Sequence, residues 1–213
     1  MAKKSKKASS DVGSMDGKEA KDGGGGRGKR ISKLFTAMQE KGAAWYDRER
    51  EGIALIEGFQ SALLAMRAAV ADGTQENDEG LSGLAGNVVM DPWLAEDLYQ
   101  QVHELSSGFQ KLLEDMYTLQ TRARDIVMAG EGEQQVEATE LRLVDYLQMM
   151  SQELATFEAE YQHIETLLQL ISFETTTDEL RTLVISWSTS PFLDPAQSRN
   201  FMQRHQLSQQ LHT

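Results

Sequence analysis

The chain has 213 residues with three prolines and no cysteine, and its formal net charge at pH 7 is −12. The absence of cysteine excludes disulfides and thiolate metal sites, which fits a reducing compartment. The charge is uneven: residues 1–30 carry nine basic and four acidic residues, whereas the remainder carries 12 basic and 29 acidic residues. An acidic body does not lie along a phosphate backbone, so we expect nucleic-acid binding at most through the tail.

Residues 1–30 lack apolar periodicity and contain four consecutive glycines, Gly23–Gly26. This composition predicts a disordered, basic Gly/Lys-rich tail, and we expect the folded domain to span 31–213. No signal-peptide core follows the first lysines. Two interpretations of these lysines remain, a solubilising tail and a minimal nuclear-import patch, and the second of them would place the protein in the nucleus as well as in the cytoplasm. The patch consists of Lys3, Lys4, Lys6 and Lys7.

The first helix is predicted at about 32–71, followed by an acidic, glycine-containing loop at 72–90. Its apolar stripe fails at 47–51, where the sequence is Asp-Arg-Glu-Arg-Glu, so this stretch is either solvated or a break in the helix. We find no apolar run long enough to cross a bilayer and expect no membrane partner. The residues on the apolar side are Ile31, Leu34, Phe35, Met38, Trp45, Ile56, Phe59, Leu63, Met66 and Val70.

Two further long helices are predicted, at about 91–128 and 134–173, with Asp91 and Pro92 starting the first of them. Apolar residues spaced alternately three and four apart form one seam on each helix, as in helices that pack along their lengths. The first seam is Leu94, Leu98, Val102, Leu105, Phe109, Leu112, Met116, Leu119, Ala123 and Ile126. The second is Val136, Glu140, Leu143, Leu147, Met150, Leu154, Phe157, Tyr161, Ile164, Leu168 and Ile171.

The connection at 129–133 is short, so the second and third helices should be antiparallel neighbours, with the first helix packed against them. Thr176 and Glu179 form a capping box for a short helix at about 177–187. Asp194 and Pro195 start a last helix at about 195–211. The sequence therefore predicts an all-α fold: an elongated bundle or coiled coil of three long helices with a short C-terminal helix-turn-helix.

One Glu-x-x-His motif, Glu160 to His163, raises the possibility of a di-metal carboxylate site. Such a site needs a second copy, and Gln100 stands three residues before His103. We therefore place Glu160 and His163 on a solvated helix face. No serine lies in a nucleophile-elbow motif. We predict no metal, no cofactor, no catalytic residue and no enzyme activity.

The segment 187–199 combines two aromatic residues, two prolines and an arginine at a helix–turn–helix junction. Two interpretations stay open here. In one, Trp187 and Phe192 fold back onto the bundle as core residues. In the other, they form an exposed anchor, because Trp, Phe and Arg are frequent at binding hot spots.

This segment resembles the C-terminal end of the cyclin-dependent kinase 2-interacting protein family, a group of small, largely helical nuclear proteins. The family's ending has a Trp, a Pro-aromatic pair, an aliphatic residue, an acid and a Ser-Arg, with one residue fewer before the Ser-Arg than here. The matching residues are Trp187, Pro191, Phe192, Leu193, Asp194, Ser198 and Arg199. A second similarity is Ala43-Ala44-Trp45, where the family has Ala-Ala-x-Trp.

The resemblance implies a non-catalytic adaptor or scaffold whose protein partners bind helix faces, with the residues just named and Trp45 as candidate contacts. It also implies cyclin-dependent kinase and replication-factor complexes, checkpoint signalling and genome maintenance. An AAA-type ATPase assembly in large ribosomal subunit maturation is the other implied setting. The alternative from the heptads alone is a structural coiled-coil subunit of a tethering or kinetochore-type complex.

Overall fold

The computed structural model describes residues 25–73, 91, 93–129 and 141–210. Within these ranges the chain forms five helices and no strand, so the predicted all-α helical bundle is confirmed. The helices are α1 (Gly25–Gly73), α2 (Leu94–Met128), α3 (Leu143–Gln169), α4 (Thr177–Ser188) and α5 (Pro195–Gln210).

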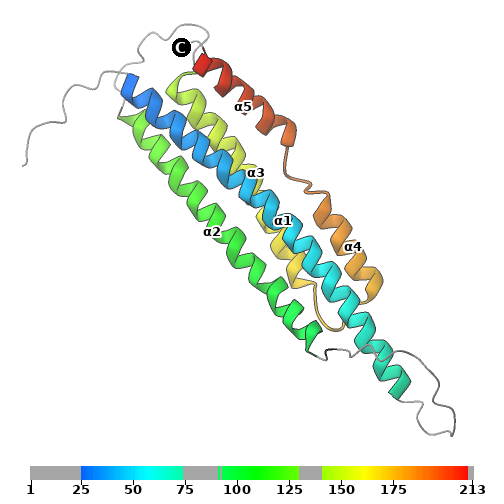
Figure 1. The fold of residues 1–213 in the computed structure, drawn as a ribbon. Coiled ribbons are helices and arrows are strands. Elements are labelled where there is room, and N and C mark those ends of the chain that lie inside the picture. Colours follow the sequence, from blue (N-terminus) through cyan, green and yellow to red (C-terminus); the bar gives the residue numbers. More distant parts are fainter. Residues whose placement is uncertain (1–24, 74–90, 92, 130–140, 211–213) are drawn as a thin grey trace, which may run out of the picture.

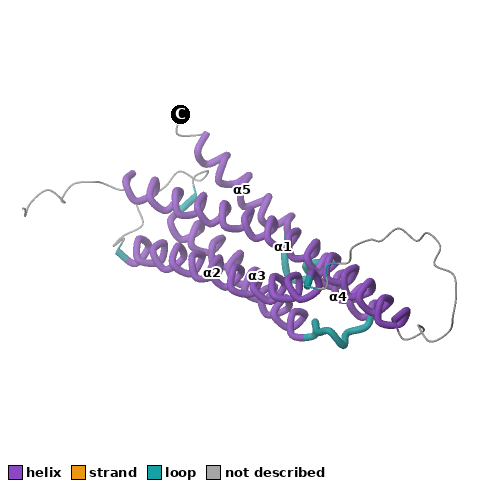
Figure 2. Tube along the Cα trace, turned by 60° about the horizontal axis from the view of Figure 1, so that its bottom comes forward, coloured by secondary structure: helices purple, strands orange, loops and turns teal. Residues whose placement is uncertain are grey.

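The bundle has four sides, although only three helices are long. α1 and α2 run side by side in opposite directions, and α3 packs against both (Figure 1). α4 and α5 follow one another back along the bundle, α4 beside the C-terminal half of α1 and α5 beside its N-terminal half (Figures 1 and 2). The fourth side is therefore interrupted near its middle by residues 189–194, which we call the corner.

α1 is 49 residues long and spans about 73 Å. It begins at Gly25, so residues 25–30, which we assigned to the tail, are helical instead. Ile31 and Phe35 are fully buried and fix the helix, and extending an existing helix backwards by a few residues is easy compared with nucleating one. Residues 1–24, including the lysine patch, lie outside the described residues.

The predicted failure of the stripe at 47–51 is wrong, because α1 continues without a break and one acid of this stretch is part of the core. Glu49 is 5 % exposed. Only the neighbours of Glu49 are at the surface, where Arg50 pairs with Asp47 and Arg48 with Glu51. The stripe is in fact regular, with alternate spacings of three and four: Phe35, Met38, Gly42, Trp45, Glu49, Gly52, Ile56, Phe59 and Leu63 are all buried.

α2 ends at Met128 as predicted but begins at Leu94, after a turn in which the Asp91 carboxylate accepts a hydrogen bond from the Trp93 N–H at 3.0 Å. Its seam is largely as predicted. The exceptions are that Leu113 and Gln120 occupy core positions expected for Leu112 and Leu119, and that Leu94 is exposed. The buried residues are Ala95, Val102, Leu105, Phe109, Leu113, Met116, Gln120, Ala123 and Ile126.

α3 is shorter than predicted, at Leu143–Gln169 rather than 134–173. Arg142 is extended and caps the helix, because its backbone N–H donates to the Asp145 carboxylate at 2.9 Å. The predicted seam positions Val136 and Glu140 lie outside the described residues. In contrast, the capping box of Thr176 and Glu179 is confirmed at the start of α4.

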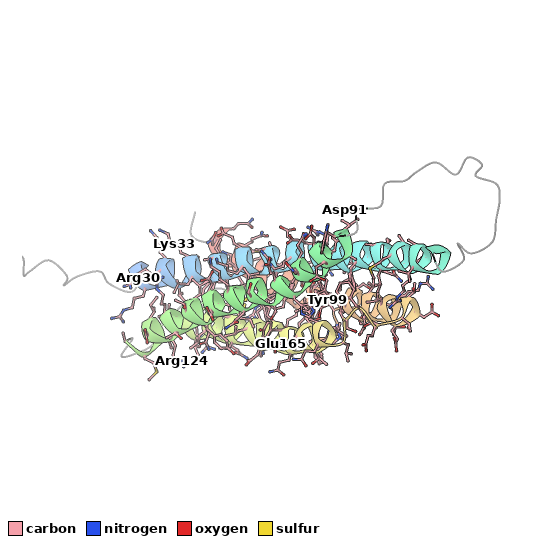
Figure 3. All side chains as sticks on the ribbon, turned by 90° about the horizontal axis from the view of Figure 1, so that it is seen from below. Arg30, Lys33, Asp91, Tyr99, Arg124 and Glu165 are labelled. Carbon is pink, nitrogen blue, oxygen red and sulfur yellow. The ribbon has the colours of Figure 1, made fainter. Side chains whose placement is uncertain are left out.

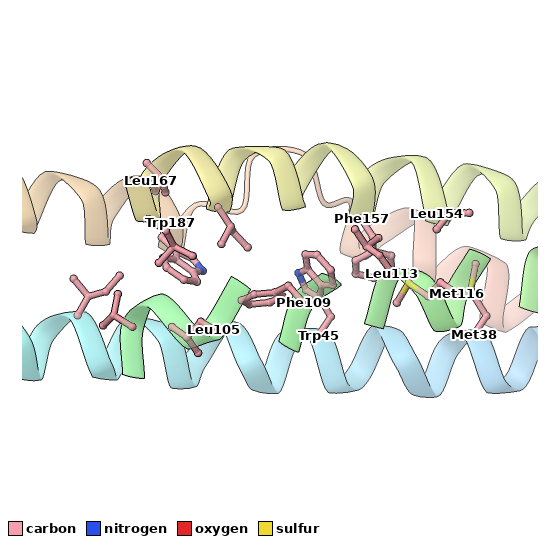
Figure 4. Packing of buried hydrophobic residues seen from close by; sticks show 14 of the residues in the cluster. Met38, Trp45, Leu105, Phe109, Leu113, Met116, Leu154, Phe157, Leu167 and Trp187 are labelled. Atoms are coloured by element: carbon pink, nitrogen blue, oxygen red, sulfur yellow. The ribbon is translucent and has the colours of Figure 1, made fainter. Parts of the chain in front are cut away.

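The core is continuous along the bundle and rich in aromatic side chains (Figure 4). Trp45 contacts Phe109 and Phe157, with ring centroids 4.7 and 5.2 Å apart. Phe109 in turn contacts Trp187 at 6.1 Å. Charged side chains such as Arg30 and Arg124 lie on the outside of the bundle (Figure 3).

One helix of the described part, within Gly26–Val70, is long and apolar enough to cross a membrane by length and composition alone. The expectation that no such run exists is therefore wrong. In this fold the apolar stripe of the same helix supplies Ile56, Phe59 and Leu63 to the bundle core.

Candidate functional site

The corner joins α4 to α5 through a tight, left-handed turn. Ser190 has a φ of 38°, a backbone conformation that is uncommon for residues other than glycine. The Ser190 N–H donates to the Trp187 carbonyl at 3.0 Å, and the Leu193 N–H donates to the Ser190 carbonyl at 3.1 Å. Asp194 precedes α5 and caps it, because its carboxylate accepts hydrogen bonds from the Ala196 and Gln197 N–H groups. This confirms the predicted helix start.

Two buried carboxylates hold the corner on the bundle. Glu160 of α3 is fully buried and accepts a hydrogen bond from the Phe192 backbone N–H at 3.1 Å. Glu49 of α1 accepts one from the Ser190 hydroxyl at 3.3 Å. The corner is therefore bound to two different helices by carboxylates that are buried.

The surroundings of the Glu49 side chain disfavour its ionised form. Burial raises the pKa of the Glu49 carboxyl to about 7, and the nearby Glu160 carboxylate adds to this. Hydrogen bonds from Trp45 Nε1, at 3.0 Å, and from Ser190 oppose the rise. The side chain is therefore divided between its neutral and ionised forms near neutral pH.

Glu160 also binds His163, and this side chain links α3 to α4. The Glu160 carboxylate lies 2.9 Å from His163 Nδ1, and His163 Nε2 lies 3.2 Å from the Ser186 hydroxyl. The prediction that Glu160 and His163 occupy a solvated face is wrong, since the His163 side chain is only 15 % exposed.

The order acid–histidine–serine matches the hydrogen-bond order of hydrolase triads, but such a site also needs free donors for an oxyanion. Ser186 lies inside α4, where its backbone N–H and that of Trp187 donate to carbonyls one turn earlier. Those groups are therefore not free to stabilise an oxyanion. The arrangement therefore has a structural role: its hydrogen bonds join α3 to α4 and to the corner.

The structure divides the predicted contact residues into two groups. Trp187 and Trp45 are both fully buried, so they are core residues and not surface contacts. Gly52 of α1 makes room for the Trp187 ring: a Cβ atom on Gly52 would lie 2.7 Å from it. In the described part of the chain, Trp187 Nε1 is buried without a hydrogen-bond partner.

The other predicted residues lie at or near the surface. Phe192 is 49 % exposed, and its ring packs edge-on against His163 with centroids 5.9 Å apart. Leu193 is partly buried against the core. The remaining members are the exposed Pro191, Asp194 and Arg199 and the half-buried Ser198.

A pocket of about 200 Å³ lies beside the corner, between α1, α3 and the first turn of α5. Glu153, which is 3 % exposed, lines it together with Tyr46 and Ser198. Burial raises the pKa of the Glu153 carboxyl, opposed by hydrogen bonds from Gln39 and Ser198. The pKa of the Tyr46 hydroxyl is also raised, first by burial and then by the surrounding carboxylates.

Sequence reasoning missed the three buried acids, Glu49, Glu153 and Glu160, because it assigned charged residues to the surface. A signal was present in the spacing. Glu49 continues the stripe from Trp45 to Gly52, while Glu153 and Glu160 fall on a regular stripe with Phe157, Ile164 and Leu167. Among the described residues, no group of three or more His, Asp or Glu side chains is arranged to hold a metal ion.

The chain was compared with family models, curated proteins and solved structures, and none of the three comparisons yielded a match.

Proposed function

We propose that this chain is a non-catalytic helical adaptor that presents the α4–α5 corner to a protein partner. The observation that carries the proposal is the state of Phe192: its ring is 49 % exposed, yet its backbone is bound to a buried carboxylate. A half-exposed aromatic side chain on a fixed backbone loses little entropy on binding, and such side chains often dominate binding energy.

The chemistry around Phe192 also fits a docking site. Pro191 precedes it, and the His163 ring packs edge-on against its ring. Asp194 and Arg199 are exposed nearby in the sequence and provide charges of both signs for a polar rim. The corner thus has an apolar centre and charged surroundings, which is the composition of many transient interfaces.

The resemblance to the cyclin-dependent kinase 2-interacting protein family leads us to propose specific settings. These are a nuclear complex with a cyclin-dependent kinase or replication factors, and an AAA-type ATPase assembly that matures the large ribosomal subunit. In either setting, the partner performs the chemistry and this chain supplies the docking surface.

Affinity purification of the tagged chain from its native cells, with mass spectrometry, tests the proposal. Phe192→Ala should reduce partner recovery at least tenfold without changing helicity, because the ring is outside the core. The matched control is Ile185→Ala, which removes an apolar side chain that is 58 % exposed on α4. Unchanged recovery with Phe192→Ala would contradict the role of the corner. Trp187 is unsuitable for this test, because its removal would damage the core.

A second candidate is a structural coiled-coil subunit of a tethering or kinetochore-type complex. It is favoured by the long antiparallel pairing of α1 with α2, which leaves Tyr117 and Met128 exposed on α2. In that case recovery should depend on Tyr117 and Met128 and be insensitive to Phe192. Recovery of an AAA-type ATPase or a cyclin-dependent kinase would instead favour the adaptor.

A further inference from the structure

The pocket beside the corner has an apolar wall and a buried acid. Met38 of α1 and Phe157 of α3 provide apolar lining, and Ala43 of α1, which is exposed, lies at its edge. Gln39 and Glu153 contribute polar atoms, with the Gln39 amide donating to the Glu153 carboxylate. At about 200 Å³ the pocket suits one side chain, since drug-sized ligands occupy about 300–1,000 Å³.

The electrostatic surroundings of the pocket are negative. Tyr46, on its wall, lies in the field of Glu49, Glu153, Glu160 and Asp194. Among the described residues, no Lys or Arg forms an ion pair with any of the three buried glutamates. The nearest described cation along α1, Lys41, pairs instead with Asp115 on α2. A carboxylate accepts about four hydrogen bonds, and the donors at the Glu153 carboxylate, the Gln39 amide and the Ser198 hydroxyl, are uncharged.

We propose that this pocket receives the side chain of a lysine from the protein partner, with the ammonium group at Glu153 and the aliphatic stem between Met38 and Phe157. An ammonium group supplies the positive charge and the donors that the buried carboxylate lacks. The four-carbon stem of lysine matches the apolar wall, as when lysine buries its methylenes along apolar surface.

The position of the pocket connects it with the proposed docking surface. Ser198 belongs to the segment 187–199 and lines the pocket, so both features lie on the α4–α5 side of the bundle. The pKa of the Tyr46 hydroxyl is raised by Glu153 in the pocket and also by Glu49 and Glu160, the two acids that bind the corner. A partner that covers Phe192 can therefore reach the pocket with a neighbouring lysine. This inference deepens the proposed function and rests on it for the identity of the occupant.

The binding step can be tested without the partner. The full chain, labelled with ¹⁵N, is titrated with Nα-acetyl-lysine N-methylamide while amide shifts are followed. We expect saturable shifts at the Gln39 side-chain amide and at backbone amides of 38–46 and 153–157. The norleucine analogue, which has the stem without the ammonium, should bind at least tenfold more weakly.

Two variants locate the site. Glu153→Gln should raise the dissociation constant at least tenfold, whereas Glu158→Gln, on the exposed face of α3, should leave it unchanged. If Glu153→Gln disturbs the fold, Ala43→Phe provides the second test, since it obstructs the pocket from an exposed position and should also abolish the shifts.

Equal binding of the norleucine analogue, or the absence of saturable shifts at these amides, would overturn the inference. Those results leave the proposed function intact if Phe192→Ala still loses the partner. Conversely, lysine binding with no effect of Phe192→Ala on partner recovery would support the pocket and reject the corner as the docking site.

Discussion

Glu49 shows how a single buried acid can make the stability of a fold depend on pH. Its carboxyl group has a pKa of about 7 in the folded chain, against 4.5 as the ordinary value. Between these two pH values the folded state therefore binds more protons than the unfolded state. The free energy of unfolding must fall as the pH rises through this window, by about 3 kcal/mol in total, and then stay level with respect to this group.

Glu49→Gln should remove this pH dependence. The amide oxygen can still accept the hydrogen bond from Trp45, and no charge is buried at any pH. We expect the variant and the parent to have similar stability at pH 4.5, and the variant to be more stable by about 3 kcal/mol at pH 8. Urea unfolding at the two pH values measures this difference. Glu51→Gln, at a side chain that is 58 % exposed, is the control and should show no such divergence.

Gly52 is required where it stands, because the Trp187 ring fills the space of a side chain. A Cβ atom would approach two ring atoms to 2.7 and 2.8 Å, and the ring is fully buried. Gly52→Ala should destabilise the fold by about 1–3 kcal/mol through overpacking.

Gly28→Ala is the matched control on the same helix, since nothing lies within 4 Å of its Cβ position. It should be neutral or stabilising by up to about 1 kcal/mol. Thermal unfolding of both variants distinguishes the two outcomes, and equal behaviour would contradict the argument.

At the scale of the elements, α5 is the helix with the smallest share of the core. It buries Phe201, His205 and Ser208, and His205 Nδ1 lies 3.0 Å from the Tyr146 hydroxyl. The Phe35 and His205 rings are in contact, with centroids 5.1 Å apart. A helix with so few buried side chains opens at lower free energy than the helices that form the core.

Burial lowers the pKa of His205, so the folded state binds fewer protons than the unfolded state just below pH 6.5. The docking of α5 is therefore strongest above pH 6.5 and weakens as the pH falls through the lowered pKa. We expect backbone amides of α5 to exchange with solvent faster than those of α1 at pH 7.5. After correction for intrinsic rates, their protection should decrease further at pH 5.5. His205→Phe should abolish that additional decrease. If α5 is as protected as α1 at both pH values, the helix is not the weak element of the bundle.

At the scale of the whole molecule, the break in the fourth side of the bundle is the feature that organises the rest. A continuous fourth helix would cover α1 and α3 along their length. The corner replaces it at mid-length with backbone N–H and hydroxyl groups, which bind Glu49 and Glu160. The same break places Phe192 at the surface and leaves the pocket beside α5. The break between α4 and α5 therefore accounts for the two buried acids at the corner, for the exposed Phe192 ring and for the pocket.

Local signals in the sequence were enough to locate most helices and two of their caps. Thr176 with Glu179 and Asp194 with Pro195 act on backbone groups within three residues, so their effect does not depend on the fold. The end of α2 at Met128 was also predicted from a local signal, the glycines at 130 and 132. The start of α3 was misplaced, because the capping of Arg142 by Asp145 has no strong sequence signature. All-α class, long amphipathic stripes and the starts of α4 and α5 were therefore determined by the sequence itself.

Only the tertiary structure decided which side of each helix is buried where the stripe contains a charged or ambiguous residue. Residue type places Glu153 and Glu160 in solvent, and Glu49 in a stretch that is either solvated or a break in the helix. Each nevertheless fills a core position where another helix or the corner supplies a donor. From the sequence, Trp187 is either an exposed anchor or a core residue. The missing side chain of Gly52 on α1 leaves the space that its ring fills, so it is a core residue. These outcomes depend on partners distant in the chain, and burial of a polar or aromatic group is set by what those partners offer it.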